Sequence, residues 1–323
     1  MYSIGIDIGG TNIACGIVTE ESALAHKLSA PYPGPQTPLA SVDVCVALSR
    51  ALLESAGLSL GQIDAVGLAV PGQIDSATGG VIHAYNLGYH DFPLKALMRA
   101  RLPEMPIHVE NDANAAALAE YYFGAFRGRA SGLLITLGTG VGGGMILNDR
   151  LFIGGRKSGF EIGHMMLQFD GEACSCGNFG CFEAYCSASA LIRDGVRAAQ
   201  AHPDCMIARQ ARQDGNKMDA KRIIDCAKAG DAVACDLFAN YTARLGAGIV
   251  SAIAILDPEV VALGGGVSNA GAFLLDAVNG YLARHVFFAN YTGQVVAAQL
   301  GNDAGVIGAA MLHTQAVPPD AEA

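Results

Sequence analysis

Two stretches of the chain share one pattern of apolar runs separated by a glycine turn. The first eighteen residues place apolar runs on both sides of Asp7 to Asn12, which predicts strand, turn, strand. Residues 133–147 repeat this in coarse form, with Leu137-Gly138-Thr139-Gly140 aligning on Ile8-Gly9-Gly10-Thr11. The repeat predicts two similar α/β lobes.

The remaining pattern places helices and strands around these hairpins. The expected elements are a helix over 39–56, a buried strand over 64–70, an irregular loop to Asp91, a short helix from Pro93, a strand over 106–109, and an alanine-rich helix reaching about Phe126. In the second half, we expect a mostly helical stretch over 187–256 with breaks near Pro203 and Gly215, a buried strand over 260–263, a closing helix from about Asp303, and a loose tail over 318–323.

No Pro-rich or Ser-rich linker separates the lobes, so their limits follow from the hairpin repeat. We expect a smaller N-terminal lobe over 1–117, to which the last helix, 303–323, returns. A larger C-terminal lobe over 118–302 would contain a metal-binding loop at 161–186. A chain of 323 residues is long enough for two such lobes with a ligand cleft between them.

Charge and cysteine content narrow the classes of function. Thirty acidic residues against 20 basic ones, a formal charge of -10, disfavour nucleic acid as a partner. The first residues lack the basic and apolar regions of a signal peptide, and no apolar run reaches about 18 residues. These features predict a soluble cytoplasmic protein that does not bind membranes. Nine cysteines in such a chain favour thiols and metal ligands over disulfides.

Three glycine turns follow apolar strands, and such turns let backbone N–H groups approach phosphates. In the first turn, Asp7 is placed to hold Mg²⁺, while Thr11 and Asn12 offer donors. The second turn offers Thr139 and Gly140, and the third, Gly264 to Gly266, has room for a nucleoside. Each turn alone reads equally well as a tight hairpin, but the set of three favours a nucleotide.

The second turn also matches the G-x-G-x-x-G pattern of dinucleotide-binding proteins, with Glu161 at the spacing of a ribose-binding acid. That pattern requires a helix after the glycines, whereas an apolar run and an Asn-Asp turn follow here. The dinucleotide interpretation therefore fails on context.

Four metal-ligating side chains lie within eighteen residues: His164, Cys174, Cys176 and Cys181. Three thiolates and one imidazole suit tetrahedral Zn²⁺, and four protein ligands close its shell, which predicts a structural site. The alternative is a set of incidental thiols. Glu161 and Glu183 flank the cluster, so a bound zinc would order a polar rim suited to a ligand rich in hydroxyl groups.

Phosphoryl transfer to an alcohol requires a carboxylate that accepts the hydroxyl proton. Asp112 follows a predicted buried strand and opens a predicted helix, which places it at a cleft edge. A helix cap is the alternative role for Asp112, and Asn111 is an equally good cap.

Taken together, these motifs resemble the ROK family (repressor, open reading frame, kinase) of the actin and hexokinase superfamily, over nearly the whole chain. The resemblance rests on residues 7–12, 110–114, 137–144, 161–164 and 174–183. It implies a two-lobed actin/hexokinase-like (ribonuclease H-like) α/β fold with an interlobe cleft, and an ATP-dependent kinase acting on a hexose at position 6. It also implies a homodimer or homotetramer.

The resemblance further implies roles for single residues. Asp112 would be the general base, and His164 would use one ring nitrogen for zinc and the other for the sugar. The implied sugar-binding residues are Gly72, Asn86, Asn111, Asp112, Glu161, His164 and Glu183. The implied nucleotide and phosphate contacts are Asp7, Gly10, Thr11, Asn12, Thr139, Gly140, Gly264 and Gly265. Tyr89 stands where many glucokinases have Trp, which leaves glucose, N-acetylmannosamine, N-acetylglucosamine, fructose and allose open.

Two other classes of protein share this family. Sugar-responsive repressors carry a helix-turn-helix domain ahead of the fold, and Asp7 already lies in the first phosphate turn, so we do not expect a DNA-binding regulator. A sugar sensor without turnover is disfavoured by the presence of Asp7, Asp112 and both phosphate turns. Polyphosphate as donor is disfavoured because no basic groove is evident.

Overall fold

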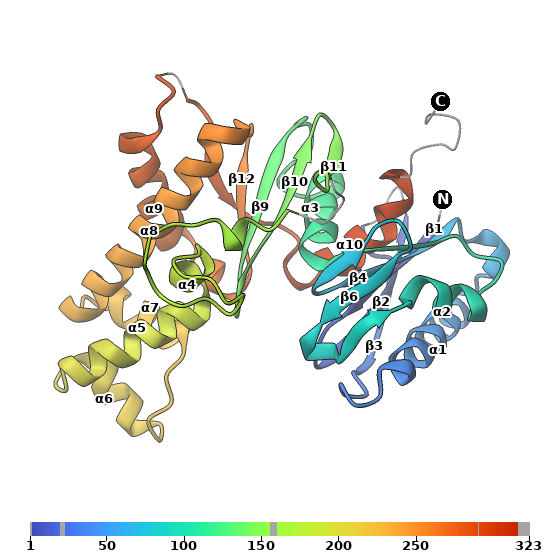
Figure 1. Cartoon of the computed structure of the whole chain (residues 1–323), viewed down its shortest axis with the longest axis horizontal. Coiled ribbons are helices and arrows are strands. Elements are labelled where there is room, and N and C mark those ends of the chain that lie inside the picture. Colours follow the sequence, from blue (N-terminus) through green and yellow to red (C-terminus); the bar gives the residue numbers. More distant parts are fainter. Residues whose placement is uncertain (1, 20–22, 156–159, 290, 316–323) are drawn as a thin grey trace. The chain divides into compact units, whose positions relative to one another are not determined.

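The computed structural model describes residues 2–19, 23–155, 160–289 and 291–315 (Figure 1). The chain divides into two compact units. Unit 1 contains residues 1–132, 144–160 and 299–323, and unit 2 contains 133–143 and 161–298. The predicted lobe limit at residue 117 falls inside α3 (Asp112–Phe123) and stays a prediction. The predicted loose tail lies outside the described residues.

Unit 1 is built on a five-stranded sheet in the order β3-β2-β1-β4-β8. Its strands are β1 (Tyr2–Ile8), β2 (Asn12–Thr19), β3 (His26–Pro31), β4 (Ala65–Val70) and β8 (Ile107–Asn111). The predicted first hairpin is confirmed, with Ile8 opposite Ile13. Strands β1, β4 and β8 run parallel, so their carboxyl ends meet at one edge of the sheet. Asp7, Gly72 and Asp112 all come from that edge.

Successive side chains of β1 point to opposite faces of the sheet. Ile4, Ile6 and Ile8 join the apolar core with α1 (Pro38–Ala56), whose Leu52 is fully buried. The opposite face bears Gly5 and Asp7 and receives α10 (Ala304–Met311). The predicted helices from 39 and from about 303 are thereby confirmed, and α2 (Leu94–Arg101) confirms the short helix expected from Pro93.

Helix α10 lies directly on the sheet because glycine removes the side chains between them. A methyl group at Gly5 would lie 1.8 Å from the carbonyl oxygen of Val306, and one at Gly67 would lie 1.7 Å from that of Ala309. Helix α3 meets α10 in the same way, since a methyl group at Gly308 would lie 1.6 Å from the carbonyl oxygen of Ala115. Backbone atoms therefore form the contact.

This contact predicts a large loss of stability on adding one methyl group. Gly308→Ala is expected to lower the free energy of unfolding by about 3 kcal/mol, because neither backbone can retreat without moving a helix. Urea denaturation measures the change. Gly61→Ala is the matched control, since a methyl group there meets nothing within 4 Å. An unfolding midpoint for Gly308→Ala equal to that of the control would contradict the prediction.

Glu120 fixes the place where the chain enters unit 1 for the last time. Its fully buried carboxylate accepts hydrogen bonds from the backbone N–H groups of Gln299 at 2.8 Å and Leu300 at 3.0 Å. The second oxygen accepts from Ala125 N at 2.7 Å. A buried carboxylate is stable only when paired in this way, so Glu120 ties the segment before α10 to α3.

The stretch predicted as an irregular loop to Asp91 is instead a small antiparallel sheet, so that prediction was wrong. Its strands are β5 (Gln73–Asp75), β6 (Gly80–Ala84) and β7 (Tyr89–Phe92), in the order β5-β6-β7. Strands of three to five residues are too short to show an alternating pattern. Glycines at 72, 79, 80 and 88 separate them and imitate a loop.

Unit 2 contains most of the second sheet, whose order is β11-β10-β9-β12-β13. Its strands are β9 (Gly132–Leu137), β10 (Val141–Leu147), β11 (Arg150–Phe152), β12 (Val261–Gly264) and β13 (Val295–Ala297), and the division between units falls within β10. The predicted second hairpin and buried strand are confirmed. The helices are α4 (Glu183–Cys186), α5 (Ala188–Ala201), α6 (Met206–Gln213), α7 (Ala220–Lys228), α8 (Ala232–Leu256) and α9 (Ala272–His285), with breaks at the predicted places.

Among the described residues, α8 is the one helix long and apolar enough to cross a membrane, with a mean hydropathy of 1.3 over its best window. The sequence predicted no membrane span, because no uninterrupted apolar run reaches about 18 residues. Its small residues are covered by neighbours, since a methyl group at Gly248 would lie 2.3 Å from the Phe182 ring and one at Gly246 would lie 2.6 Å from Tyr281. Arg244 pairs with Asp194. Helix α8 is therefore the core helix of unit 2.

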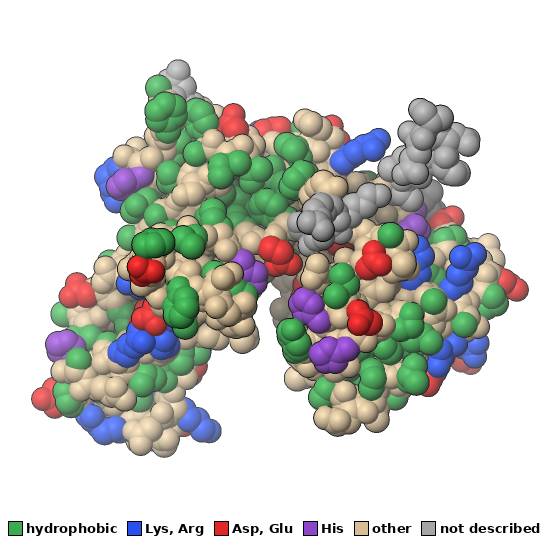
Figure 2. All heavy atoms as spheres, viewed as in Figure 1, with side chains coloured by type: hydrophobic (Ala, Val, Ile, Leu, Met, Phe, Trp, Pro, Cys, Tyr) green, Lys and Arg blue, Asp and Glu red, His purple; other side chains and the backbone are tan. Residues whose placement is uncertain are grey.

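Charged side chains of both signs are visible on the face shown in Figure 2. On the face shown in Figure 2, Lys and Arg side chains stand singly or in small groups among acidic and apolar ones. That distribution matches the acidic balance of the sequence.

Candidate active site

The first phosphate turn is a tight hairpin with exposed donors. Gly9 N donates to Asn12 O at 2.9 Å, which closes the turn. Gly10, Thr11 and Asn12 are exposed, so their polar groups face outward. Asn86 lies beside this turn, because a methyl group on Gly10 would be 3.3 Å from its side-chain nitrogen. The structure thus brings two predicted ligand-binding segments of unit 1 together.

Asp7 is the last but one residue of β1 and lies on the face covered by α10. A methyl group at Gly305 would lie 2.5 Å from a carboxylate oxygen of Asp7, so the missing side chain at 305 makes room for this carboxylate. Burial and, to a smaller extent, the charge of Asp112 raise the pKa of Asp7, Lys27 opposes the rise, and the result is a pKa of about 6. Asp7 and Asp112 are therefore close enough to interact electrostatically.

The pKa of Asp7 predicts how the stability of the ligand-free chain depends on pH. A carboxyl group whose folded pKa exceeds its unfolded value stabilises the fold below that unfolded value, and this stability is lost as pH rises through about 6. Asp7→Asn should therefore stabilise the chain relative to wild type by about 1–2 kcal/mol at pH 8 and by much less at pH 4. Urea denaturation at both pH values checks this. A difference independent of pH would refute it.

The hydrogen bonds at the junction between β8 and α3 show whether Asn111 or Asp112 caps the helix. Asn111 is the cap, and its side-chain oxygen accepts from Ala113 N at 2.9 Å and from Asn114 N at 3.3 Å. Its amide group donates to Gly72 O at 3.1 Å. Gly72 has φ +95°, and a methyl group there would lie 2.1 Å from His83 O, so only glycine fits.

Asp112 is the first residue of α3 and is left free for chemistry by this arrangement. One of its carboxylate oxygens accepts from Ala113 N at 2.9 Å. Burial raises its pKa above the ordinary value, and the backbone hydrogen bond only partly offsets the rise. A carboxylate of raised pKa at a helix start has the basicity that proton abstraction requires.

In unit 2, the second phosphate turn is held by α4 and α5. Gly138 N donates to Gly140 O at 3.0 Å, and Ala188 N donates to Gly138 O at 2.8 Å. Ser189 Oγ donates to Thr139 O at 2.8 Å. The carboxylate of Glu183 accepts from Val141 N at 2.9 Å, so this predicted sugar-binding residue contacts the phosphate turn directly.

The third glycine turn lies against the second. Gly265 has φ +81°, and a methyl group there would lie 2.6 Å from the backbone of Leu137. The third glycine turn therefore contacts the end of β9, from which the second glycine turn begins. Glycine is required at 265 both for its conformation and for this contact.

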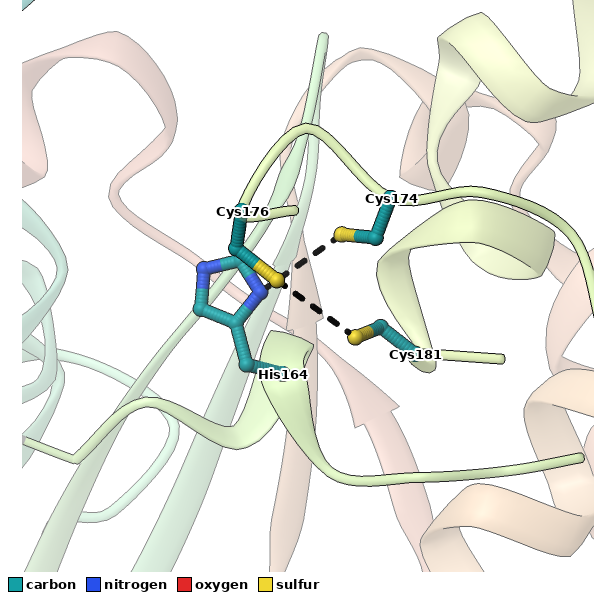
Figure 3. Close-up of side chains that lie close together, drawn as sticks. All are labelled: His164, Cys174, Cys176 and Cys181. Carbon is teal, nitrogen blue, oxygen red and sulfur yellow. Dashed lines mark hydrogen bonds between the residues drawn. The ribbon is translucent and has the colours of Figure 1, made fainter. Parts of the chain in front are cut away.

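The four predicted metal ligands converge (Figure 3). Their ligand atoms all lie within 4.8 Å of one another. His164 Nδ1 is 3.7 Å from Cys174 Sγ, and Cys176 Sγ is 3.7 Å from Cys181 Sγ. Tetrahedral zinc with metal–sulfur bonds of about 2.3 Å separates its ligand atoms by about 3.8 Å. The donor set and its spacing therefore fit Zn²⁺.

The loop around the cluster is shaped by glycine and by two isolated bridges. Met166 pairs with Cys181 and Ala173 pairs with Phe179. Gly180 has φ +74°, and a methyl group there would lie 1.7 Å from Gln168 O. This contact explains why glycine directly precedes Cys181.

The comparisons with known proteins agree with this geometry. A model of the ROK family matches residues 3–316. A glucokinase from Streptomyces coelicolor is 38% identical over 323 residues, covering 98% of both chains, and a glucokinase from Halalkalibacterium halodurans is 35% identical, covering 97% of this chain and 95% of the relative. The crystal structure of a ROK family glucokinase from Streptomyces griseus in complex with glucose and AMPPNP has a TM-score of 0.81 at 36% identity, covering 98% of this chain and 100% of that one.

The chain belongs to the ROK family.

Its fold is the actin/hexokinase-like α/β fold of ROK kinases, as the sequence predicted. The two units each hold part of the predicted set of site residues. Unit 1 carries Asp7, Gly10, Thr11, Asn12, Gly72, Asn86, Asn111 and Asp112, and unit 2 carries Thr139, Gly140, Glu161, His164, Glu183, Gly264, Gly265 and the three metal-ligating cysteines.

Glu161 and His164 belong to one short turn of this ROK chain. The turn Ile162–His164 is a 3-10 helix, and His164 N donates to Glu161 O at 3.1 Å. A methyl group at Gly163 would lie 2.0 Å from Val141 O, so the turn rests on β10. Both side chains are on exposed residues, as groups that bind a soluble ligand must be.

Tyr89, the residue that departs from the ROK glucokinase pattern, is a core residue here. Its side chain is fully buried, its hydroxyl lies 2.5 Å from Ser41 Oγ, and its ring stacks on Phe92 at 4.3 Å between centroids. It ties β7 to α1. Tyr89 therefore does not present a surface to a ligand.

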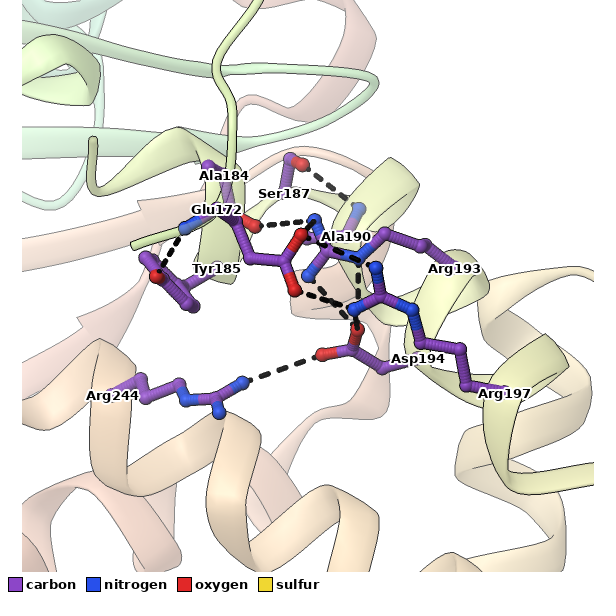
Figure 4. A network of polar contacts seen from close by, with 9 residues as sticks. All are labelled: Glu172, Ala184, Tyr185, Ser187, Ala190, Arg193, Asp194, Arg197 and Arg244. Carbon is purple, nitrogen blue, oxygen red and sulfur yellow. Dashed lines mark hydrogen bonds and ion pairs between the residues drawn. The ribbon is translucent and has the colours of Figure 1, made fainter. Parts of the chain in front are cut away.

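A polar network not evident from the sequence holds the loop of the predicted metal ligands in this ROK chain (Figure 4). Glu172, between the ligands His164 and Cys174, pairs with Arg197 and Arg193 of α5. Its backbone N–H donates to Tyr185 Oη at 2.7 Å, and Arg244 lies over the Tyr185 ring at 4.9 Å. These partners are distant in sequence, and no local sequence pattern predicts the contacts between them.

Proposed function

We propose that this chain is an ATP-dependent sugar kinase that transfers the γ-phosphoryl group of ATP to a hexose hydroxyl. The observation that carries the proposal is the placement of Asp112 at the start of α3, with its pKa raised by burial and beside the carboxylate of Asp7. Glucokinases that match this chain over nearly its whole length support the same reaction.

Each of the proposed site residues has a role in the transfer of the γ-phosphoryl group. Asp112 accepts the proton of the attacking hydroxyl, whose oxygen bonds to the γ-phosphorus while the bond to the bridging β,γ oxygen breaks and ADP leaves. The N–H and hydroxyl groups of the turns at 10–12 and 139–140 hold the phosphates. Asp7 is the carboxylate that would hold Mg²⁺, which would supply positive charge against the phosphates when bound with ATP.

The proposed partners of the sugar hydroxyls are the side chains that the family resemblance implies. Asn86, Asn111, Glu161 and Glu183 supply acceptors or donors, and Gly72 supplies a backbone approach. His164 directs Nδ1 at Cys174 Sγ, which leaves Nε2 for a hydroxyl group. Every such pairing matters, because a buried hydroxyl without a partner lowers affinity and transition-state binding.

Zinc in the His164, Cys174, Cys176 and Cys181 site would have a structural role. Four protein ligands leave no position for an activated water. The chemistry it supplies is to fix the loop on which Glu161, His164 and Glu183 stand. We also place the enzyme in the cytoplasm as a homodimer or homotetramer.

Glucose is the acceptor we favour. The matching relatives are named glucokinases, and a similar solved structure is described as a complex with glucose. The buried position of Tyr89 removes the sequence-based reason to set glucose aside. Position 6 is the proposed acceptor hydroxyl.

A coupled ADP-release assay with Mg·ATP tests the proposal. The panel is glucose, mannose, N-acetylmannosamine, N-acetylglucosamine, fructose and allose, with enzyme of known zinc content. Turnover with glucose at least tenfold above every other sugar is expected. Turnover with another sugar alone would correct the substrate, and no turnover in zinc-replete enzyme would leave a sensor that binds sugar without reacting.

A further inference from the structure

The junction that carries Asp112 contains a second carboxylate, Glu110, to which the proposed function gives no role. Alternation along β8 puts Glu110 on the face of the sheet that α10 covers, the face of Asp7. Register places Ala69 between them, opposite Asp7 on one side and opposite Glu110 on the other. The three residues form one row across the sheet, at the edge where Asp112 begins α3.

One carboxylate oxygen of Glu110 accepts two hydrogen bonds. Its Oε1 accepts from the backbone N–H of Asn111 at 2.8 Å and from the side-chain Nδ2 of Asn114 at 3.0 Å. Asn114 is only 1% exposed, and its own Oδ1 has no hydrogen-bond partner among the residues that the structure describes. Leaving a buried oxygen unpaired costs stability, which offsets part of what the hydrogen bond from Asn114 to Glu110 contributes.

Asp112 stands between these two anchored residues. Its carboxylate is hydrogen-bonded to the backbone N–H of Ala113 at 2.9 Å and to the backbone of Asp112 itself, so its direction depends on the backbone that carries it. Glu110 holds the residue before Asp112 through a main-chain bond and reaches the first turn of α3 through Asn114. The geometry thereby restrains the backbone on both sides of the carboxylate.

We propose that Glu110, acting through Asn114, is a positioning residue that sets the direction of the Asp112 carboxylate for proton abstraction. This inference rests on the proposed kinase function. A shift of about 1 Å in a reacting group can cost about a hundredfold in rate, so the effect of losing the restraint should appear in turnover.

The role assigned to Glu110 is geometric. Burial is the leading reason that the pKa of Asp112 is raised, and the charge of Glu110 is not among the causes. A glutamine offers the same oxygen to both donors. It should therefore replace Glu110, whereas alanine should not.

Three variants test the proposal with glucose and Mg·ATP, or with the sugar that the panel identifies. Glu110→Gln should keep kcat within about threefold of wild type. Glu110→Ala should lower kcat by about 30-fold to 100-fold while the KM for sugar changes by less than about threefold, the mark of an interaction needed in the transition state. Glu104→Ala, at an exposed position in the segment before β8, is the control and should behave as wild type.

Asn114→Leu separates positioning from stability. Leucine removes the donor to Glu110, which costs stability, and the unpaired buried oxygen, which restores some, so this variant should unfold near the wild-type midpoint in urea, yet lose about tenfold in kcat. It also keeps the test valid if Glu110→Ala fails to fold.

Each other outcome counts against the proposal. Full turnover by a folded Glu110→Ala or Asn114→Leu enzyme would overturn it. A Glu110→Gln enzyme as slow as Glu110→Ala would also overturn it, because it would show that Glu110 acts through its charge and not through its geometry. A wild-type enzyme inert toward all sugars would instead refute the proposed function, and this inference with it, which distinguishes the two failures.

Discussion

Asp112→Asn is expected to reduce kcat by about a thousandfold, the range in which general bases contribute. Asparagine keeps the oxygen that accepts from Ala113 N at 2.9 Å, so the helix start should be preserved, but it cannot take up the hydroxyl proton. The sugar should still bind, because the other proposed partners of its hydroxyl groups remain. The coupled assay measures kcat, and calorimetric titration measures the dissociation constant of the sugar.

Asp64→Asn is the control for this variant. Asp64 precedes β4 at the opposite end of the sheet and accepts a hydrogen bond from Tyr2 N at 3.0 Å, which asparagine can also accept. Its kinetics should match those of wild type. Pure Asp112→Asn enzyme that retains a tenth or more of wild-type kcat would show that another group accepts the proton.

Cys176→Ser is expected to remove bound zinc and most of the activity together. Cys176 is exposed, so the substitution itself disturbs little packing, and any effect comes through the metal. Zinc content should fall from about one per chain to near zero, because a structural site depends on all four ligands. Loss of the ordered loop should lower kcat/KM by about a hundredfold or more. Plasma emission spectrometry gives the zinc content.

Cys235→Ser provides the comparison at a cysteine outside the cluster. Cys235 lies on α8 and contacts Ala227 O, and its loss should leave zinc and kcat/KM unchanged. A Cys176→Ser enzyme that is active without zinc would refute the proposed structural role. One that is active with a full complement of zinc would show that Cys176 is not a ligand.

Local patterns in the sequence predicted the parts of the molecule that depend on neighbours along the chain. The two hairpins, the buried strands and the four metal ligands lie within short segments, so spacing alone brings their residues together. The same holds for the helix start at 111–112, although the sequence left open whether Asn111 or Asp112 was the cap.

Features built by distant segments were not predictable in this way. The role of Gly305 beside Asp7 depends on a helix almost 300 residues further on returning to β1. Glu172 and its arginines meet only after α5 packs on the metal loop. The small sheet β5-β6-β7 was missed for a different reason, because its strands are too short for periodicity to register.

The position of α10 reverses the usual order in which a nascent chain acquires its structure. Domains commonly fold as units from the N-terminus during synthesis. Here β1 is among the first segments made, yet the glycine surface of its sheet is covered only once residues 304–311 have been translated. Unit 2, which ends at Ala298, is complete earlier. The glycine surface of the unit 1 sheet can therefore be covered by α10 only after the whole of unit 2 has been synthesised.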